Sequence, residues 1–194
     1  TINAMKNLED NPNNPVSMNC IGKMYQDGKY VQINADKAIH YYEEAANQNY
    51  AASQCNLGII YYYGEIVKSD INKALHYLQL SAKQNYSNAE YLLGVIYYEG
   101  DNEIERNIKK SLEYFNSAAI HGSPEAQYQL GIIYYQGYFV TKDIDRSIKY
   151  FELAANQDII QAQNNLGLIF YEGKYVSRDI NKAIKYYTMA ANKN

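Results

Sequence analysis

The residues of this chain best suited to acid–base or metal chemistry are three histidines and two cysteines, and their spacing favours neither role. His40 and His76 stand at equivalent positions of a repeating pattern, but the same position later holds Glu113, Lys149 and Lys185. That exchange is typical of a solvated surface, and no converging partners accompany either ring. His121 stands where other repeats carry glutamine. We therefore predict that the histidines lie on the surface and have no catalytic role.

Cys20 and Cys55 provide neither a disulfide framework nor the spacing of a metal site. They fall at non-equivalent positions of neighbouring predicted helices, whose axes should lie about 8 to 10 Å apart, so we expect packing residues and no bridge. The triplet Asn85-Tyr86-Ser87 fits a glycosylation site, but Asn85 also falls in a predicted helix-ending position. No phosphate loop, HExxH or nucleophile elbow occurs. The sequence predicts a protein that is not an enzyme and has no catalytic residue, cofactor or metal.

Composition excludes several partners. The net charge of -3 and pI of about 5.6 do not supply the positive surface on which nucleic-acid binding normally depends. No run approaches the roughly 18 to 20 apolar residues of a membrane span, and the first 20 residues lack the pattern of a signal peptide. We expect a soluble chain with no direct membrane insertion; its compartment and oligomeric state stay open.

Glycines reveal the elements that position these residues. They recur in pairs six residues apart, and the pairs follow each other every 36 or 37 residues: Gly22 and Gly28, Gly58 and Gly64, Gly94 and Gly100, Gly131 and Gly137, Gly167 and Gly173. Self-similarity at this period is the signature of a repeat architecture. Each segment reads close to LGxxYxxG, and a small pair such as Ala45-Ala46 follows 23 residues after the first glycine.

Each repeat reads as two helices. In the first helix the apolar residues and an aromatic form one stripe, the first glycine permits close packing, and the second glycine ends the helix. The second helix begins at an Asx residue that can cap free N–H groups: Asn34, Asp70, Asn107, Asp143 and Asp179. Asn49, Asn85, Gly122 and Asp158 suit a left-handed conformation after it. A basic residue recurs three positions after each cap (Lys37, Lys73, Lys110, Arg146, Lys182), where the helix dipole disfavours a cation.

The predicted organisation is one continuous repeat domain of ten helices without a β-sheet. We expect the tail of a preceding helix in 1–12 and repeats at 13–48, 49–84, 85–121, 122–157 and 158–194. A single helix pair cannot bury its apolar faces, so neighbours must stack. The absence of a polar capping helix leads us to expect a piece of a longer protein.

The chain resembles the Sel1-like repeat family, relatives of tetratricopeptide repeats, over nearly its whole length. Repeat two carries Leu57-Gly58, Tyr61, Gly64, Asp70 and Lys73-Ala74 on the family positions. The family's second loop glycine is replaced by Tyr30, Ile66, Phe139 and Tyr175. The resemblance implies an all-α fold, a right-handed α-α superhelix or solenoid of about five helix-turn-helix repeats, and a role in adaptor or signalling complexes.

A second register of tyrosines follows the core aromatics by one residue: Tyr62, Tyr98, Tyr135 and Tyr171. By analogy with tetratricopeptide geometry these side chains line a concave surface that binds a protein or peptide, in which aromatic anchors edged by polar groups are typical. The alternative is that they pack against the first helix of the next repeat. The predicted partner-binding set is Asn19, Lys23, Ile59, Tyr62, Tyr91, Val95, Tyr98, Glu99, Tyr128, Ile132, Tyr135, Gln136, Asn164, Leu168, Tyr171 and Glu172.

The predicted function is a protein–protein interaction scaffold or adaptor. The alternatives are a structural spacer or regulatory arm of a larger protein, and a neutralising, antitoxin-type partner of an enzyme. The carboxylates in the predicted set would favour a basic ligand.

Overall fold

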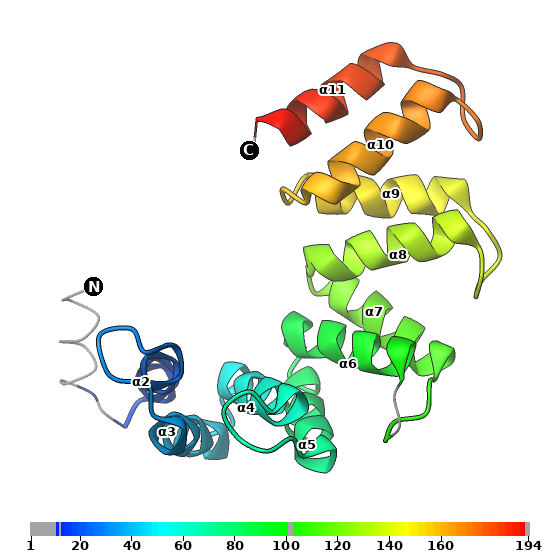
Figure 1. Cartoon of the computed structure of the whole chain (residues 1–194). Coiled ribbons are helices and arrows are strands. Elements are labelled where there is room, and N and C mark those ends of the chain that lie inside the picture. Colours follow the sequence, from blue (N-terminus) through cyan, green and yellow to red (C-terminus); the bar gives the residue numbers. More distant parts are fainter. Residues whose placement is uncertain (1–10, 12, 101–102, 193–194) are drawn as a thin grey trace. The chain divides into compact units, whose positions relative to one another are not determined.

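Asx residues and glycines delimit ten α-helices in the part of the chain that the structure describes. The computed structural model describes residue 11, residues 13–100 and residues 103–192, and this part contains no β-strand. The helices are α2 (Pro15–Asp27), α3 (Ala35–Asn47), α4 (Ala51–Tyr63), α5 (Ile71–Ala82), α6 (Ser87–Glu99), α7 (Ile108–Ile120), α8 (Pro124–Gln136), α9 (Ile144–Ala155), α10 (Ile160–Glu172) and α11 (Ile180–Ala191) (Figure 1). The predicted all-α fold is confirmed. The predicted helix tail in 1–12 falls, apart from residue 11, outside the described residues.

All five predicted N-caps are confirmed. The side chain of each Asx residue accepts a hydrogen bond from the backbone N–H three residues later, as in Asp143, which accepts from Arg146 at 2.9 Å. The backbone N–H of each cap also donates to the carbonyl of the core aromatic of the first helix, for example Asp143 to Tyr134 at 3.0 Å. The same residue thus starts the second helix and closes the loop onto the first.

Close approach within each hairpin requires the first glycine. A Cβ at Gly131 would lie 2.5 Å from Cδ1 of Phe151, and a Cβ at Gly94 would lie 2.5 Å from Cδ1 of Phe115. Both aromatic side chains are almost fully buried, so they have little room to move. The second glycines have φ between 63° and 72°, in the left-handed region that ends a helix.

The basic residue three positions after each cap forms a stack with two aromatic rings. Arg146 lies 5.4 Å from the ring of Tyr134, which stacks on Tyr150 at 5.8 Å with an interplanar angle of 2°. The corresponding cations in the other hairpins, Lys37, Lys73, Lys110 and Lys182, lie 4.8 to 5.0 Å from the equivalent rings. A cation over an aromatic face is stabilising, which offsets the unfavourable helix dipole.

The chain divides into two compact units, residues 1–93 and 94–194. In the first unit α2 packs on α3, α3 on α4 and α4 on α5, around a core that includes Tyr42, Leu57 and Ala74. In the second unit α7 packs on α8, α8 on α9, α9 on α10 and α10 on α11. The core of this unit includes Phe151, Leu166 and Phe170. Each unit thus follows the neighbour-to-neighbour packing that a helical repeat requires.

Candidate partner-binding surface

All sixteen predicted partner-binding residues lie on the first helices of the hairpins, α2, α4, α6, α8 and α10, and none of them is buried. The most exposed apolar members are on α10, where Leu168 is 43% and Tyr171 is 51% exposed. First helices therefore present a partly apolar surface to solvent.

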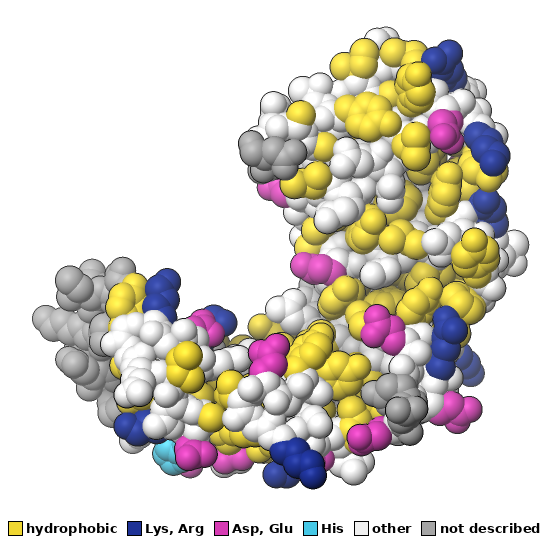
Figure 2. Space-filling model, in the orientation of Figure 1, with side chains coloured by type: hydrophobic (Ala, Val, Ile, Leu, Met, Phe, Trp, Pro, Cys, Tyr) yellow, Lys and Arg dark blue, Asp and Glu magenta, His cyan; other side chains and the backbone are white. Residues whose placement is uncertain are grey.

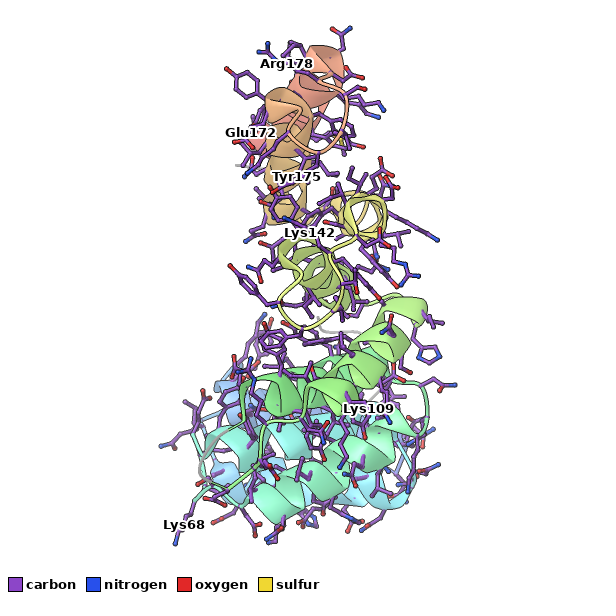
Figure 3. All side chains as sticks on the ribbon, turned by 90° about the vertical axis from the view of Figure 1, so that its right-hand side faces the viewer. Lys68, Lys109, Lys142, Glu172, Tyr175 and Arg178 are labelled. Atoms are coloured by element: carbon purple, nitrogen blue, oxygen red, sulfur yellow. The ribbon has the colours of Figure 1, made fainter. Side chains whose placement is uncertain are left out.

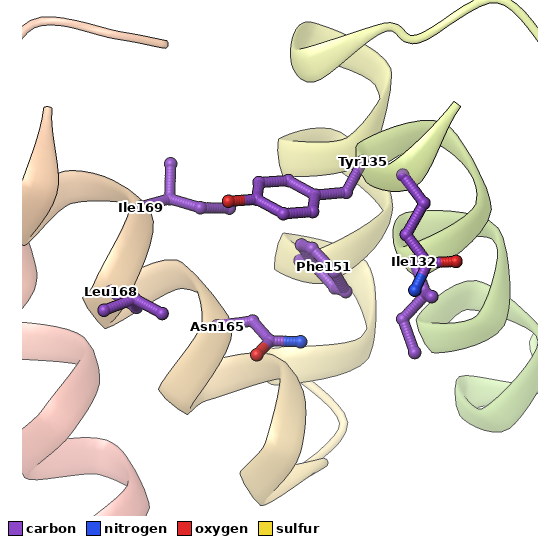
Figure 4. A pocket seen from close by; sticks show the side chains of 7 residues that line it. Ile132, Tyr135, Phe151, Asn165, Leu168 and Ile169 are labelled. Atoms are coloured by element: carbon purple, nitrogen blue, oxygen red, sulfur yellow. The ribbon is translucent and has the colours of Figure 1, made fainter. Parts of the chain in front are cut away.

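A pocket of about 250 Å³ lies on this surface in the second unit (Figure 4). Its lining consists of Ile132, Tyr135 and Gln136 from α8, Phe151 from α9, and Asn165, Leu168 and Ile169 from α10. Phe151 and Ile169, at 1% and 5% exposure, form the apolar floor. All lining residues are on helices, so the pocket is held rigidly by the packing of two consecutive hairpins.

The sequence identified part of this pocket. Ile132, Tyr135, Gln136 and Leu168 were in the predicted set, and the structure brings them together. Phe151, Asn165 and Ile169 were missed. Phe151 and Ile169 belong to the core stripes, and nothing in the repeat pattern indicates that one edge of the core opens to solvent here. Asn165 stands beside the predicted Asn164, one residue further along α10.

Two tyrosines of the second register, Tyr98 and Tyr135, contact an aromatic residue in the loop of the following hairpin. The ring of Tyr98 meets Phe139 edge-on at 5.6 Å and 87°, and Tyr135 meets Tyr175 in the same way at 5.8 Å and 89°. A cation lies near both rings of each pair, Arg106 in the first and Lys142 in the second. Tyr98 and Tyr135 therefore pack on a loop aromatic of the following hairpin, whereas the alternative named the first helix of that hairpin.

These contacts also explain two of the four loop residues that depart from the Sel1-like pattern. Phe139 and Tyr175 supply the ring that covers the preceding tyrosine. Lys142 Nζ donates to the Tyr175 hydroxyl at 3.0 Å and, with Lys174, lowers the pKa of this phenol below its ordinary value. Figure 3 shows Lys142 and Tyr175 side by side at the loop edge of the second unit, where Figure 2 shows hydrophobic atoms interspersed with Lys and Arg. Tyr30 instead has φ 74° and is 59% exposed.

In the first unit the predicted residues form mainly internal contacts. The Asn19 side-chain oxygen accepts hydrogen bonds from Ser53 Oγ and Asn56 Nδ2, both at 2.9 Å. Tyr62 meets Tyr63 edge-on at 5.1 Å. Asn19 therefore joins α2 to α4, and its oxygen is already occupied by this network.

The histidines and cysteines are the side chains for which the sequence predicted no acid–base or metal role. His40 and His76 are exposed and lie 5.4 Å from the rings of Tyr41 and Tyr77, and His121 is the C-terminal cap of α7. Cys55 is buried, which raises the pKa of its thiol to about 12, and both cysteines are free. The expectation that Cys20 packs inside is wrong, because this side chain is exposed. No cluster of three metal-ligating side chains was found among the described residues.

No helix within the described ranges is long and apolar enough to cross a membrane.

Comparisons with known proteins agree with this geometry. The Sel1 repeat model matches residues 15–50, 51–86, 87–123, 124–159 and 160–194. A Sel1 repeat protein from Oxalobacter formigenes is 32% identical with a TM-score of 0.87, and the match covers 95% of this chain and 75% of that one. A search of curated proteins found no match.

Two further solved structures are similar. The protective antigen c5321 of uropathogenic Escherichia coli, which has an SLR fold, is 27% identical with a TM-score of 0.81; the match covers 94% of this chain but only 39% of the antigen. The immunity protein Pa5087 of Pseudomonas aeruginosa is 20% identical with a TM-score of 0.63, over 92% of this chain and 68% of that one, and shares the fold. Because the Sel1 repeat model matches all five hairpins, the chain belongs to the Sel1 repeat family.

Proposed function

We propose that this chain is a scaffold that binds an extended segment of a partner protein, with one apolar side chain of that segment in the pocket between α8 and α10. Sel1 repeat proteins are generally non-enzymatic protein-interaction scaffolds. The observation that carries the finer proposal is the pocket itself, an apolar depression floored by Phe151 on a rigid helical surface.

The size of the pocket favours a side chain over a small-molecule cofactor. Ligand pockets for drug-sized molecules occupy roughly 300 to 1,000 Å³ and bury most of the ligand. A volume of about 250 Å³ that is open to solvent falls below that range. It suits an aliphatic or aromatic side chain whose backbone stays on the surface.

The polar groups in the lining suit a peptide backbone. Asn165 and Gln136 each carry an amide that can donate and accept hydrogen bonds, and Tyr135 adds a hydroxyl. No charged side chain lines the pocket, so the predicted preference for a basic ligand has no support at this point. Binding should depend on apolar contact and amide hydrogen bonds, and should therefore vary little with salt concentration.

Leu168→Glu tests the proposal. The variant places a carboxylate in the pocket, and because Leu168 is 43% exposed, folding should be preserved. Peptides selected from a random displayed library against the wild-type chain are expected to bind Leu168→Glu at least about tenfold more weakly, measured by fluorescence anisotropy, because apolar contact is lost and a charge is desolvated.

Leu153→Glu is the matched control. Leu153 is 40% exposed on α9 and does not line the pocket, so this variant should bind the same peptides with wild-type affinity. Equal binding to both variants would contradict the pocket proposal. Failure to select any peptide would favour the structural spacer. Tyr135→Ala is a poorer test because it also removes the contact with Tyr175.

A further inference from the structure

The phenol of Tyr175 lies at the loop edge of the second unit, close to two lysines. Lys142 Nζ donates a hydrogen bond to the phenol oxygen at 3.0 Å and lies 4.3 Å from the ring centroid (Figure 3). Lys174 Nζ lies 5.1 Å from the same centroid. The ring also meets Tyr135 of α8 edge-on at 5.8 Å. The oxygen is therefore surrounded by cations, on a ring that is held in place by the preceding hairpin.

The ring is open to solvent because of its position in the loop. Tyr175 is 40% exposed. Phe139 occupies the equivalent position of the preceding loop and is 41% exposed, although a complete hairpin follows it. The exposure is thus a property of this loop position in both hairpins, and a reagent can reach the phenol oxygen without local unfolding.

The two lysines favour the ionised phenol. The hydrogen bond from Lys142, and after it Lys174, lowers the pKa of Tyr175 below its ordinary value; within the described part of the chain these are the charged groups that act on it. Burial instead raises the pKa of Tyr77 and Tyr150. A nucleophile with a lowered pKa is activated near neutral pH, because more of it is present in the ionised form.

The same lysines suit an anionic group on the phenol oxygen. A phosphoryl group on tyrosine carries a charge of about −1.5 to −2 and three acceptor oxygens. Lys142 and Lys174 supply two cationic donors from consecutive loops, and hydrogen bonds between ionised groups are among the strong ones. An acyl group offers these lysines no charge. The arrangement therefore activates the oxygen and also favours a phosphorylated product.

We propose that Tyr175 is a covalent modification site that accepts a phosphoryl group from a nucleoside triphosphate bound to a separate kinase. The phenol oxygen attacks the terminal phosphorus, so that a new O–P bond forms and the bond to the leaving nucleoside diphosphate breaks. The phenol proton passes to a base of the kinase. Lys142 and Lys174 then become the counterions of the phosphate. This inference does not depend on the pocket or its ligand.

The nucleophilicity of the phenol can be measured without a kinase, with diisopropyl fluorophosphate as the phosphoryl donor. The phenol oxygen displaces fluoride from phosphorus, and peptide mass spectrometry gives the labelling rate at each tyrosine. Tyr175 is expected to react at least about threefold faster than Tyr138 near neutral pH. Tyr138 is 77% exposed, so accessibility alone predicts the opposite order. Labelling of Tyr175 at the rate of Tyr138 or below would overturn the proposal.

Lysine variants separate the charge from the exposure of the ring. Lys142→Gln should slow the labelling of Tyr175 at least about threefold, because the phenolate loses its main partner. Lys142→Arg retains the charge and should keep most of the rate. Lys149→Gln makes the same charge change at an exposed lysine of α9 and is the matched control. A rate at Tyr175 that does not respond to Lys142→Gln contradicts the proposal.

Phosphotyrosine incorporated at position 175 during synthesis tests whether the lysines receive the phosphate. Phosphorus nuclear magnetic resonance follows its second ionisation, which ordinarily has a pKa of about 6. The midpoint is expected at least about 0.3 pH units lower with Lys142 present than in Lys142→Gln, because an ammonium group favours the dianion. Lys149→Gln should leave the midpoint unchanged. Equal midpoints with and without Lys142 would overturn the proposal.

Discussion

Replacing Leu130 by alanine is expected to lower the free energy of unfolding by roughly 2 to 5 kcal/mol, more than the same change at Ile21. Leu130 is fully buried on α8, which packs on both α7 and α9. Ile21 occupies the equivalent position on α2 and is only half-buried. The larger loss follows because Leu130 is fully buried, so its truncation leaves an enclosed cavity that the surroundings fill only partially, whereas Ile21 is partly exposed to solvent.

Urea denaturation followed by circular dichroism measures this difference, with Ile21→Ala as the internal control. Both variants remove three carbon atoms from a helix, and the helix propensities of leucine and isoleucine differ by only about a few tenths of a kcal/mol. Equal losses for both variants would contradict stacking of hairpins as the source of stability.

The fold is also expected to be lost in alkali, because burial raises the pKa of several tyrosines. Desolvation is the main cause for Tyr42, Tyr77, Tyr86, Tyr150 and Tyr186, and it raises the pKa of Tyr186 to about 12. A phenol with a raised pKa in the folded state contributes its full stability below pH 10, the pKa in the unfolded chain. That contribution is lost as pH rises through the folded pKa, because the unfolded chain releases its protons first.

Calorimetry should therefore show a melting temperature that begins to fall near pH 10 and falls further as pH rises towards 12, since each kcal/mol lost shifts the melting temperature of a chain of this size by about 2 to 4 °C. Tyr186→Phe should reduce this fall, because it removes one titrating phenol at the cost of the hydrogen bond to Glu152. A melting temperature that stays level to pH 11, with all tyrosines already ionised in the folded protein, would contradict the account.

Local signals predicted the elements well because they act within one hairpin. Asp143 caps α9 through an N–H three residues away, and Gly137 ends α8 by its own φ. The role of Arg146 could not be predicted in this way. Its partner Tyr134 is twelve residues earlier and becomes its neighbour only when the loop closes. The structure thus supplies the missing reason for a cation in the first helical turn.

Contacts between hairpins were harder to predict. Phe139 and Tyr175 read as departures from the repeat pattern, yet each covers a tyrosine of the preceding hairpin. The repeat pattern predicts that Phe151 is a core residue, and its side chain is buried. One edge of its ring nevertheless lines the pocket. Apolar periodicity reports which face of a helix is covered. It does not report where two covered faces diverge enough to leave a pocket, because that depends on side-chain packing between repeats.

The central claim is that a partner segment places an apolar side chain in the pocket between α8 and α10. The most direct test is nuclear magnetic resonance of the isotope-labelled chain titrated with a peptide selected against it. The account predicts that the largest shift changes fall at Ile132, Asn165 and Leu168, with nuclear Overhauser contacts between the peptide's apolar side chain and the Phe151 ring. Shift changes confined to exposed positions away from the pocket, such as Leu153 and Ile184, would contradict it.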